Sequence, residues 1–474
     1  MEMKRKTKII ATIGPATSSK EMLKELILRG VNVCRLNFSH GVHSDHESVV
    51  NFVRELDEEL GTHTALLADL QGPKLRVGKM EENSLLKVGA TFKLVNREMV
   101  GNADEAYMNY AKLPKEVQKG ELILLDDGKL MLEVTSTNGT DEVVTEVKVG
   151  GVLSSNKGVN LPNTEISLPS LTDKDREDLK YALELGVDWI GLSFVRSARD
   201  IIELKHVIKN AHAKARVVAK IEKPQAIKDI DDIILVTDAI MVARGDLGVE
   251  MPMEQVPVLQ KQIVKKCLQH AKPVIIATQM METMLDTPVP TRAEVSDVAN
   301  AVMDGADAVM LSGETSVGDY PLRVIDYMVK ILKEVEGNYE ELYNHERVPE
   351  KNQERFITDS ICFNACRFAA SIEAKAIVTM THSGYTAFKI SSQRPKANIF
   401  VFSSNKFLLS MMSLVWGVNC FYYDKMVSTD HTIADIKYLL KKNGFVEEGD
   451  IVINTASMPI EDKGDTNMLK LSYI

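Results

Sequence analysis

Short apolar runs alternate with amphipathic segments along most of the chain. The first run, Thr7–Ile13, is rich in β-branched residues, and the segment Glu21–Leu28 after it has apolar residues at helical spacing and stops at Gly30. This unit of strand, turn and helix recurs, which is typical of parallel strands joined by helices. The runs that we interpret as such strands are Thr7–Ile13, Val33–Phe38, Ala65–Leu70, Trp189–Phe194, Val217–Ile221, Ala239–Val242, Val274–Thr278 and Ala308–Ser312.

These eight runs are nearly all followed by a helical pattern, and eight is the number that a closed (β/α)8 barrel requires. A doubly wound open sheet is the alternative. Polar residues at the strand ends favour the barrel, because a barrel gathers those ends at one mouth and an open sheet spreads them along an edge. They are Arg35, Asn37, Asp69, Ser193, Lys220, Glu222, Arg244, Asp246, Thr278 and Ser312.

Two segments interrupt this pattern. Between 73 and 167 the chain reads as short alternating strands with Asp-Gly and Asn-Gly turns, which predicts a small all-β domain able to cover the barrel mouth. From about Glu341 the chain forms a last segment with an α/β pattern. A Val348–Pro349 dipeptide near its start suits a linker. We therefore expect a barrel from 1–72 plus 168–340, an inserted β lid from 73–167 and a C-terminal α/β domain from 341–474.

Composition narrows the class of protein. The chain has 474 residues, enough for about three domains, and its 57 basic and 67 acidic residues leave a net charge of −10. This balance argues against a nucleic-acid partner, although a local basic patch can still bind a small anion. No apolar run reaches the roughly eighteen residues of a membrane helix, so no membrane partner is expected. We expect a cytoplasmic protein with five reduced cysteines, namely Cys34, Cys267, Cys362, Cys366 and Cys420.

The segment Val217–Pro224 carries the clearest chemical signal. It ends a buried strand with Lys220 and Glu222, which are two apart and therefore lie on the same face. Such a pair at the inner end of a barrel strand is costly unless something binds there, although a structural ion pair is the alternative. The next strand adds Asp246, which we expect to face Glu222 across the mouth. Two carboxylates beside a lysine suit Mg²⁺, which takes few protein ligands and completes its shell with substrate oxygens and water.

Other strand ends add anion-binding and hydroxyl groups. Arg35 presents a planar cation suited to phosphate, in front of a turn that carries Asn37 and Ser39 and that can also be a simple capped turn. Gly245 permits close approach of a ligand to the backbone, and the helix start after it offers N–H groups to an anion. Thr278 places a hydroxyl at a strand end.

Together these groups predict a phosphoryl-transfer site. Arginine and lysine suit the phosphoryl group, two carboxylates suit Mg²⁺ and small hydroxyls suit a proton relay, so that positioning and charge neutralisation would do most of the catalysis. The sequence has neither a Walker lysine loop nor the glycine loop of protein kinases.

At this point the sequence resembles the pyruvate kinase family over essentially its whole length. The matching motifs include ATIGPA, CRLNFSHG, GPKLR, KGVNLP, SFVR, AKIE, VARGDLG, ATQMMETM, PTRAEVSDVANAVMDGADAVMLSGET and GDYP, in that order. The resemblance implies a barrel with a β lid inserted after the third strand and a C-terminal α/β domain. It also implies transfer of the phosphoryl group of phosphoenolpyruvate to ADP, which gives pyruvate and ATP.

The resemblance also implies roles for individual residues. Lys220 would stabilise the transferring phosphoryl group and the enolate, Glu222 and Asp246 would hold Mg²⁺ (Mn²⁺ being possible), and Arg35 would neutralise phosphate charge. The substrate site would comprise Arg35, Ser193, Lys220, Gly245, Asp246 and Thr278, with enolate protonation through water, Thr278 and Ser312. The nucleotide site would comprise Arg35, His40, Arg76 and Lys157. At Val317 some members carry a lysine near the nucleotide, which leaves that contact open.

This sequence also departs from many family members at the positions of a monovalent-cation site. Many members bind K⁺ through positions matching Asn37, Ser39, Asp69 and the Leu70 carbonyl, with glutamate at the position of Lys74 and threonine at that of Leu70. Here the run DLQGPKLRV resembles the K⁺-independent subgroup. Because the ammonium of Lys74 can supply the charge of a bound monovalent ion, we expect no K⁺ requirement.

The C-terminal domain is expected to hold an effector. Thr381, Ser383 and Thr386 lie between a strand and a helix, where hydroxyls and N–H groups can cradle a phosphate, although ordinary helix capping is the alternative. The resemblance implies a sugar-phosphate or related phosphometabolite there, and a homotetramer.

Two other functions compete with this one. A barrel aldolase or mutase acting on phosphoenolpyruvate would need no nucleotide. A catalytically dead barrel kept as a sensor would be expected to lack Lys220, Glu222 or Asp246, all of which are present.

Overall fold

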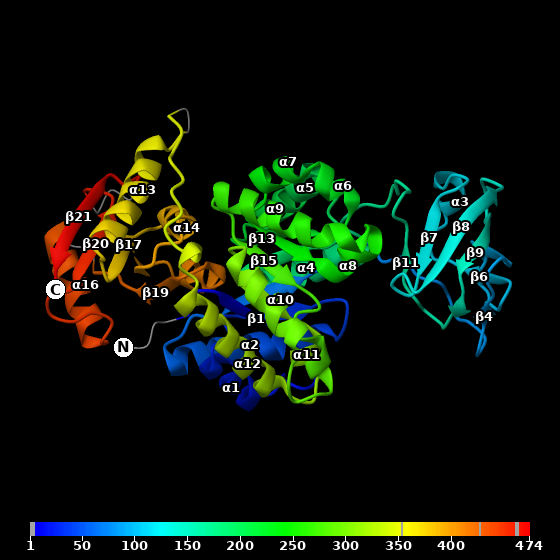
Figure 1. Ribbon diagram of the computed structural model, residues 1–474, viewed down its shortest axis with the longest axis horizontal. Coiled ribbons are helices and arrows are strands. Elements are labelled where there is room, and N and C mark those ends of the chain that lie inside the picture. The colour runs from blue at the N-terminus through cyan, green and yellow to red at the C-terminus, as the bar shows by residue number, and fades with distance from the viewer. Residues whose placement is uncertain (1–4, 352–353, 426–427, 460–463) are drawn as a thin grey trace.

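The computed structural model describes residues 5–351, 354–425, 428–459 and 464–474. Three bodies follow one another along the long axis of the molecule (Figure 1). A central barrel lies between the C-terminal α/β domain on one side and a small β domain on the other. The N-terminal end of the described chain lies on the side of the C-terminal domain.

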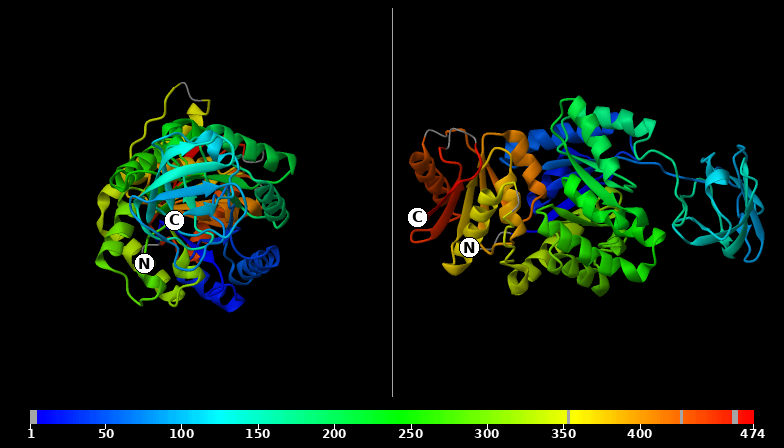
Figure 2. Two further views of the ribbon diagram at one scale, coloured as in Figure 1. Left: turned by 90° about the vertical axis from the view of Figure 1, so that its right-hand side faces the viewer. Right: turned by 90° about the horizontal axis from the view of Figure 1, so that it is seen from above.

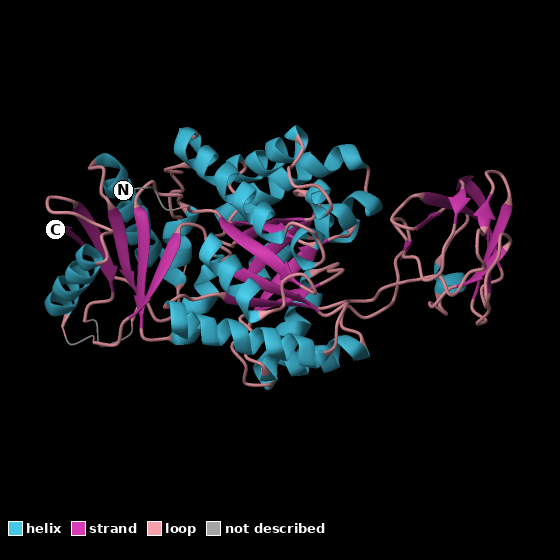
Figure 3. Ribbon diagram, turned by 90° about the horizontal axis from the view of Figure 1, so that it is seen from below, coloured by secondary structure: helices cyan, strands magenta, loops and turns pink. Residues whose placement is uncertain are grey.

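The central body is a closed barrel of parallel strands in the order β1-β16-β15-β14-β13-β12-β3-β2. This confirms the predicted (β/α)8 architecture and excludes the open sheet. The strands surround the axis inside a ring of helices (Figure 3). Their bounds are β1 (Lys8–Ile13), β2 (Val33–Asn37), β3 (Ala65–Asp69), β12 (Trp189–Leu192), β13 (Arg216–Ile221), β14 (Ala239–Ala243), β15 (Val274–Ala277) and β16 (Ala308–Leu311).

Some helices of the ring begin at polar caps. Thr172 and Asp175 form a reciprocal capping box at the start of one helix, and Thr291 and Glu294 do so at another. The helix over His43–Leu60 begins after Val42, whose side chain makes no capping hydrogen bond. The long helices are α1 (Lys20–Arg29), α2 (His43–Leu60), α4 (Asp173–Glu184), α5 (Ala198–Asn210), α9 (Val256–Gln269), α10 (Arg292–Met303) and α12 (Pro321–Asn338). Short helices follow some strands: α6 (Pro224–Lys228), α7 (Ile230–Val236), α8 (Arg244–Glu250) and α11 (Gly313–Ser316).

The inserted domain is an all-β body at the barrel mouth. A six-stranded sheet in the order β11-β7-β8-β9-β5-β6 is joined by a two-stranded sheet, β10-β4. Viewed along the long axis, this domain lies in front of the barrel end (Figure 2). The strands are β4 (Leu85–Leu86), β5 (Thr91–Val95), β6 (Glu105–Tyr107), β7 (Leu122–Leu125), β8 (Leu130–Thr137), β9 (Glu142–Val149), β10 (Gly151–Val152) and β11 (Val159–Asn160), with α3 (Leu113–Glu116).

The C-terminal domain closes the opposite end of the barrel. Its sheet has the order β19-β18-β17-β20-β21 and is parallel except for β21, an antiparallel edge strand that the sequence pattern did not predict. The indole Nε1 of Trp189 donates to the Met411 carbonyl at 3.2 Å, so the barrel interior is continuous with this domain. Its elements are α13 (Phe356–Ser371), β17 (Ala376–Met380), α14 (Tyr385–Ser392), β18 (Asn398–Ser403), α15 (Lys406–Met411), β19 (Val418–Tyr422), α16 (Thr429–Lys442), β20 (Ile451–Ala456) and β21 (Met468–Tyr473).

Among the described residues, no helix combines the length and the apolar character needed to cross a bilayer. The five cysteines are free thiols, and all but Cys420 are buried.

Candidate active site

Lys220 lies at the centre of the mouth, at the end of β13. Its Nζ lies 3.1 Å from Asp69 Oδ1 and 2.9 Å from Glu222 Oε1, and it donates to Ser193 Oγ at 2.7 Å. Burial opposes the charge on Lys220, but Asp69 and Glu222 outweigh it and hold the pKa of Lys220 above its ordinary value. The side chain is therefore an ammonium ion at neutral pH.

Arg35 joins this cluster from β2. Its Nε donates to Asp69 Oδ2 at 2.8 Å, and Nη1 donates to Thr12 Oγ1 at 2.9 Å. Asp69 is 1% exposed, and its carboxylate contacts both cations of the site, Arg35 and Lys220. Thr12 was not predicted as a site residue. The signal that could have found it is its place near the end of β1, the one barrel strand to which no polar end residue was assigned.

Glu222 and Asp246 approach each other from β13 and α8. Glu222 is 1% exposed, and its Oε2 accepts the backbone N–H of Phe194 at 2.7 Å. Burial raises the pKa of Glu222, the negative charge of Asp246 raises it further, and Lys220 opposes both. Two carboxylates that repel each other beside an open cavity are suited to a cation.

The donor set fits Mg²⁺ better than it fits a metal ion whose ligands all come from the protein. The described residues contain no group of three or more His, Cys, Asp or Glu side chains arranged to hold a metal ion. A pair of carboxylates is nevertheless what Mg²⁺ uses when substrate and water supply its remaining ligands.

Thr278 closes one side of the cavity and has an uncommon backbone conformation. Its φ is +67°, and that of Gln279 is +56°, in the left-handed region that β-branched residues rarely enter. This conformation lets Thr278 Oγ1 accept the N–H of Gly245 at 2.7 Å. An anion bound at this amide, as the sequence predicts, would therefore replace a hydrogen bond that the protein makes to itself.

Ser312 occupies the turn between β16 and α11. Its backbone N–H donates to Glu314 Oε2 at 2.6 Å, and Glu314 is 3% exposed. Burial raises the pKa of Glu314, opposed by backbone N–H groups that include that of Ser312. Glu314 was not named from the sequence, although it stands inside a motif that was quoted. It holds the loop that carries the Ser312 hydroxyl.

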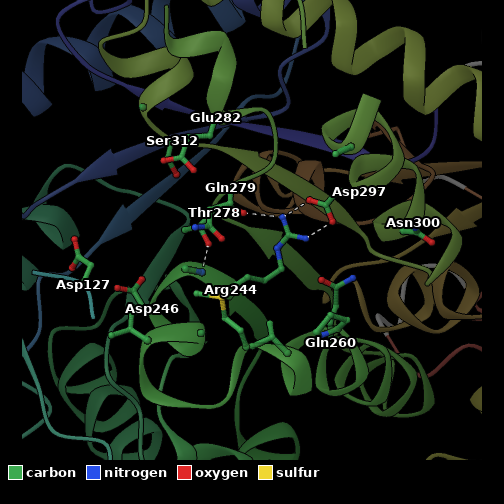
Figure 4. A pocket seen from close by; sticks show the side chains of 18 of the residues that line it. Asp127, Arg244, Asp246, Gln260, Thr278, Gln279, Glu282, Asp297, Asn300 and Ser312 are labelled. Carbon is green, nitrogen blue, oxygen red and sulfur yellow. Dashed lines mark hydrogen bonds and ion pairs between the residues drawn. The ribbon is translucent and has the colours of Figure 1, made fainter. Parts of the chain in front are cut away.

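A cavity of about 1140 Å³ opens beside these groups. Asp246, Thr278 and Ser312 line it, together with Lys74 and with Asp127 of the inserted domain (Figure 4). The cavity runs on between α9 and α10, past a bidentate ion pair of Arg244 with Asp297 at 2.6 and 2.7 Å. It is large enough for a nucleotide-sized ligand as well as a small acid.

The positions matching a monovalent-cation site lie together, and most already have protein donors. Asn37 Oδ1 accepts the Ser39 N–H at 3.1 Å, and Asp69 is bound by Arg35 and Lys220. The Leu70 carbonyl accepts from Ser193 Oγ at 2.7 Å.

The residues predicted for the nucleotide divide between barrel and inserted domain. Arg76 donates to the Asn156 carbonyl at 2.8 Å, and Lys157 pairs with Asp126 at 2.8 Å, both within the inserted domain. His40 lies on the barrel side and is exposed. Partial desolvation lowers the pKa of His40, and the nearby cations Lys74, Arg76 and Arg35 lower it further.

The loop predicted for an effector lies at the opposite end of the molecule. Thr381 Oγ1 accepts the Gly384 N–H at 3.0 Å, and Thr386 Oγ1 is 2.7 Å from Thr466 Oγ1. Ser383 is exposed, and its carbonyl accepts from Arg216 Nη2 at 3.2 Å. Arg216 is the first residue of β13, the strand whose other end carries Lys220.

A closed barrel whose mouth combines buried cations with opposed carboxylates defines the class of the protein, a (β/α)8-barrel phosphotransferase. Comparison with known families agrees in detail. A family model described as "Pyruvate kinase, barrel domain" matches residues 4–325, and one described as "Pyruvate kinase, alpha/beta domain" matches residues 359–472. The chain belongs to the pyruvate kinase family.

Individual relatives are similar over nearly the whole chain. A pyruvate kinase of Corynebacterium efficiens is 42% identical over 476 residues, covering 100% of this chain and 98% of the relative. One of Geobacillus stearothermophilus is 41% identical, covering 100% of this chain and 81% of the relative. Among solved structures, a pyruvate kinase from Cryptosporidium parvum superimposes with a TM-score of 0.93 at 34% identity, covering 99% of this chain and 96% of that one.

Proposed function

We propose that this chain catalyses transfer of the phosphoryl group of phosphoenolpyruvate to ADP, giving pyruvate and ATP, as the last step of glycolysis. The observation that carries the proposal is the set of contacts around Lys220, whose ammonium is held by Asp69, Glu222 and Ser193 at the barrel mouth. Positioned positive charge is the main requirement for moving a phosphoryl group.

The chain's own residues divide the work as follows. Arg35 and Lys220 neutralise the phosphoryl oxygens, and Lys220 also stabilises the enolate that forms as the phosphoryl group leaves. The Gly245 and Asp246 amides and Thr278 hold the substrate carboxylate, while Ser193 orients Lys220. The enolate then takes up a proton through water, Thr278 and Ser312.

The reaction is proposed to depend on Mg²⁺, with Mn²⁺ as a possible substitute, held by Glu222 and Asp246. Such an ion, when bound, would bring substrate oxygens together and offset their negative charge. The mutual repulsion of these two carboxylates supports the assignment.

Independence from K⁺ is a further part of the proposal. The protein donors on Asp69 and on the Leu70 carbonyl support it, because they already occupy oxygens that K⁺ would need. Lys74 would supply the missing positive charge. A loss of rate greater than about tenfold on removal of K⁺, equivalent to ~1.4 kcal/mol of barrier, would contradict it.

The nucleotide would bind between barrel and lid, at Arg35, His40, Arg76 and Lys157. The electropositive surroundings of His40 support this. Binding would require Lys157 to exchange its partner Asp126 for phosphate oxygens, because the two are paired in this structure.

We also propose the organisation of the protein around this reaction. Residues 1–72 with 168–340 form the catalytic domain, 73–167 the lid and 341–474 the regulatory domain. A phosphometabolite would bind at Thr381, Ser383 and Thr386. The enzyme would be a homotetramer in the cytoplasm, where its free thiols stay reduced.

The experiment measures pyruvate formation from phosphoenolpyruvate, ADP and Mg²⁺ in a buffer free of K⁺, and again after addition of K⁺. Full activity in the first condition supports the enzyme and the K⁺ proposal together. Activity only in the second keeps the enzyme and removes the K⁺ proposal. Consumption of phosphoenolpyruvate without ADP would favour an aldolase or mutase instead. No turnover by folded protein would favour a sensor.

A further inference from the structure

The carboxylate of Glu250 joins three parts of the molecule. Glu250 is the last residue of α8 and is 4% exposed. Its Oε1 accepts from Asn160 Nδ2 of β11 at 2.8 Å and pairs with Lys223 Nζ at 2.5 Å. Its Oε2 is buried and, among the described residues, has no partner. The inserted domain, the loop after β13 and α8 thus meet at one side chain.

The two barrel elements that meet here are those that carry the proposed metal ligands. Lys223 directly follows Glu222, and Asp246 lies four residues before Glu250, one turn earlier on the same side of α8. The ion pair between Lys223 and Glu250 therefore bridges the two backbones whose separation sets the distance between the Glu222 and Asp246 carboxylates.

Lys223 is itself held in place. It is 9% exposed, and its Nζ lies 5.6 Å from the centre of the Phe194 ring. The backbone N–H of Phe194 donates to Glu222 Oε2. Phe194 has a φ of +54°, an uncommon conformation for a bulky residue that the surrounding contacts must maintain. A buried ion pair in such surroundings contributes more to fixed geometry than to net stability.

The lid also lies close to the same turn of α8 at a second place. A Cβ added at Gly128, in the turn between β7 and β8, would lie 3.7 Å from Val249 Cγ1. Glu250 and Val249 both lie in the last turn of α8, whereas Gly245 and Asp246 occupy its first turn. Because α8 has only seven residues, we treat it as one short rigid body. A movement of the lid at Asn160 would therefore also move Asp246, a proposed metal ligand on the same helix.

We propose that Glu250 is a positioning residue that sets the spacing of Glu222 and Asp246 for a divalent cation and ties the lid, through Asn160, to the same point. This inference rests on the metal site of the proposed function. It assigns no contact between Glu250 and the cation or the substrate.

Direct binding of Mn²⁺ to the full-length protein, followed by the EPR signal of the free ion, tests the proposal without turnover. Glu250→Gln should raise the Mn²⁺ dissociation constant about tenfold or more, the size of effect expected when a group that supports the position of metal ligands is lost. Glu336→Gln is the matched control, because Glu336 is a 2% exposed carboxylate that accepts the backbone N–H groups of Lys6 and Thr7 elsewhere in the barrel. It should leave Mn²⁺ binding unchanged.

Further variants separate the possible outcomes. Glu222→Gln removes a proposed ligand, so unchanged Mn²⁺ binding in that variant would remove the metal site itself. If Glu222→Gln weakens binding and folded Glu250→Gln does not, only the positioning role is overturned. Should Glu250→Gln not fold, Glu250→Asp keeps the charge, shortens the reach and should weaken Mn²⁺ binding in the same direction; wild-type affinity in it would overturn the role.

A separate variant tests the connection between Glu250 and the lid. Asn160→Ala should leave the Mn²⁺ dissociation constant unchanged and increase hydrogen exchange of the backbone around β11, because only the tie to the lid is cut. Exchange equal to that of the wild type would remove the lid from the proposal.

Discussion

The hydroxyl of Thr12 holds Arg35 in place: Arg35 Nη1 donates to Thr12 Oγ1 at 2.9 Å, and the hydroxyl donates its own proton to the Leu311 carbonyl at 2.8 Å. The guanidinium is thereby fixed on both sides, since its Nε is bound to Asp69. Thr12 and Leu311 belong to neighbouring strands, β1 and β16, so the barrel wall itself orients the arginine.

Replacing Thr12 by valine tests this role. Thr12→Val keeps the shape and removes the acceptor, so we expect the KM for phosphoenolpyruvate to rise about tenfold, as loss of a hydrogen bond to a charged group allows. Thr12→Ser retains the hydroxyl and should stay near wild type. Steady-state kinetics with phosphoenolpyruvate varied at saturating ADP measures the effect, and an unchanged KM in Thr12→Val would contradict it.

Reversing the charge of Lys74 tests the K⁺ proposal. Lys74→Glu removes a positive charge from the lining of the cavity and adds a negative one, which should create a demand for a monovalent cation. We expect its rate in K⁺-free buffer to fall at least about tenfold, or ~1.4 kcal/mol, and to recover when K⁺ is added. Lys79→Glu makes the same charge change at another exposed position of the chain and is the control. Full activity of Lys74→Glu without K⁺ would refute the charge argument.

The barrel could be predicted from the sequence because each strand and the polar residue that ends it are close together along the chain. Polar residues such as Lys220 and Thr278 end apolar runs, and a closed sheet is the arrangement that brings them to one place. Glu250 and Thr12 were missed because their roles depend on partners far along the chain, such as Asn160, 90 residues away from Glu250. Nothing in the sequence around Glu250 marks its role, whereas the place of Thr12 near the end of β1 is a signal that was overlooked. The edge strand β21 was missed because its side chains are partly exposed and lack a clear buried face.

The effector loop gives a third prediction. Replacing Thr381, Ser383 and Thr386 together by alanine removes three hydroxyls at the start of α14, so activation by a phosphometabolite should be lost. A panel of sugar phosphates and nucleotides, assayed at low phosphoenolpyruvate, provides the measurement. Ser371→Ala, which removes a hydroxyl from the exposed end of α13, is the control. Activation of the triple variant by every compound that activates the wild type would contradict the site.

Asp188, at the start of β12, gives a prediction for pH. It is 1% exposed, and its Oδ2 accepts the Leu66 N–H at 2.7 Å and pairs with Arg54 at 2.9 Å. Burial raises the pKa of Asp188 from 3.8 to about 6, and Arg54 opposes that rise. Because folding raises the pKa, the folded state binds the proton more tightly. The resulting stabilisation is fully present below about pH 4 and is lost as the pH rises through about 6.

Asp188→Asn, which cannot titrate, isolates this contribution. The free energy of unfolding of the wild type minus that of Asp188→Asn should fall between pH 4 and 6 by at most about 3 kcal/mol, from about two pKa units at 1.36 kcal/mol each. Urea unfolding followed by the fluorescence of the adjacent Trp189 measures it. In an Arg54→Met background the fall should move to higher pH, because the opposing charge is gone. A difference that stays flat or grows with pH would show that Asp188 is charged in the folded protein throughout this range.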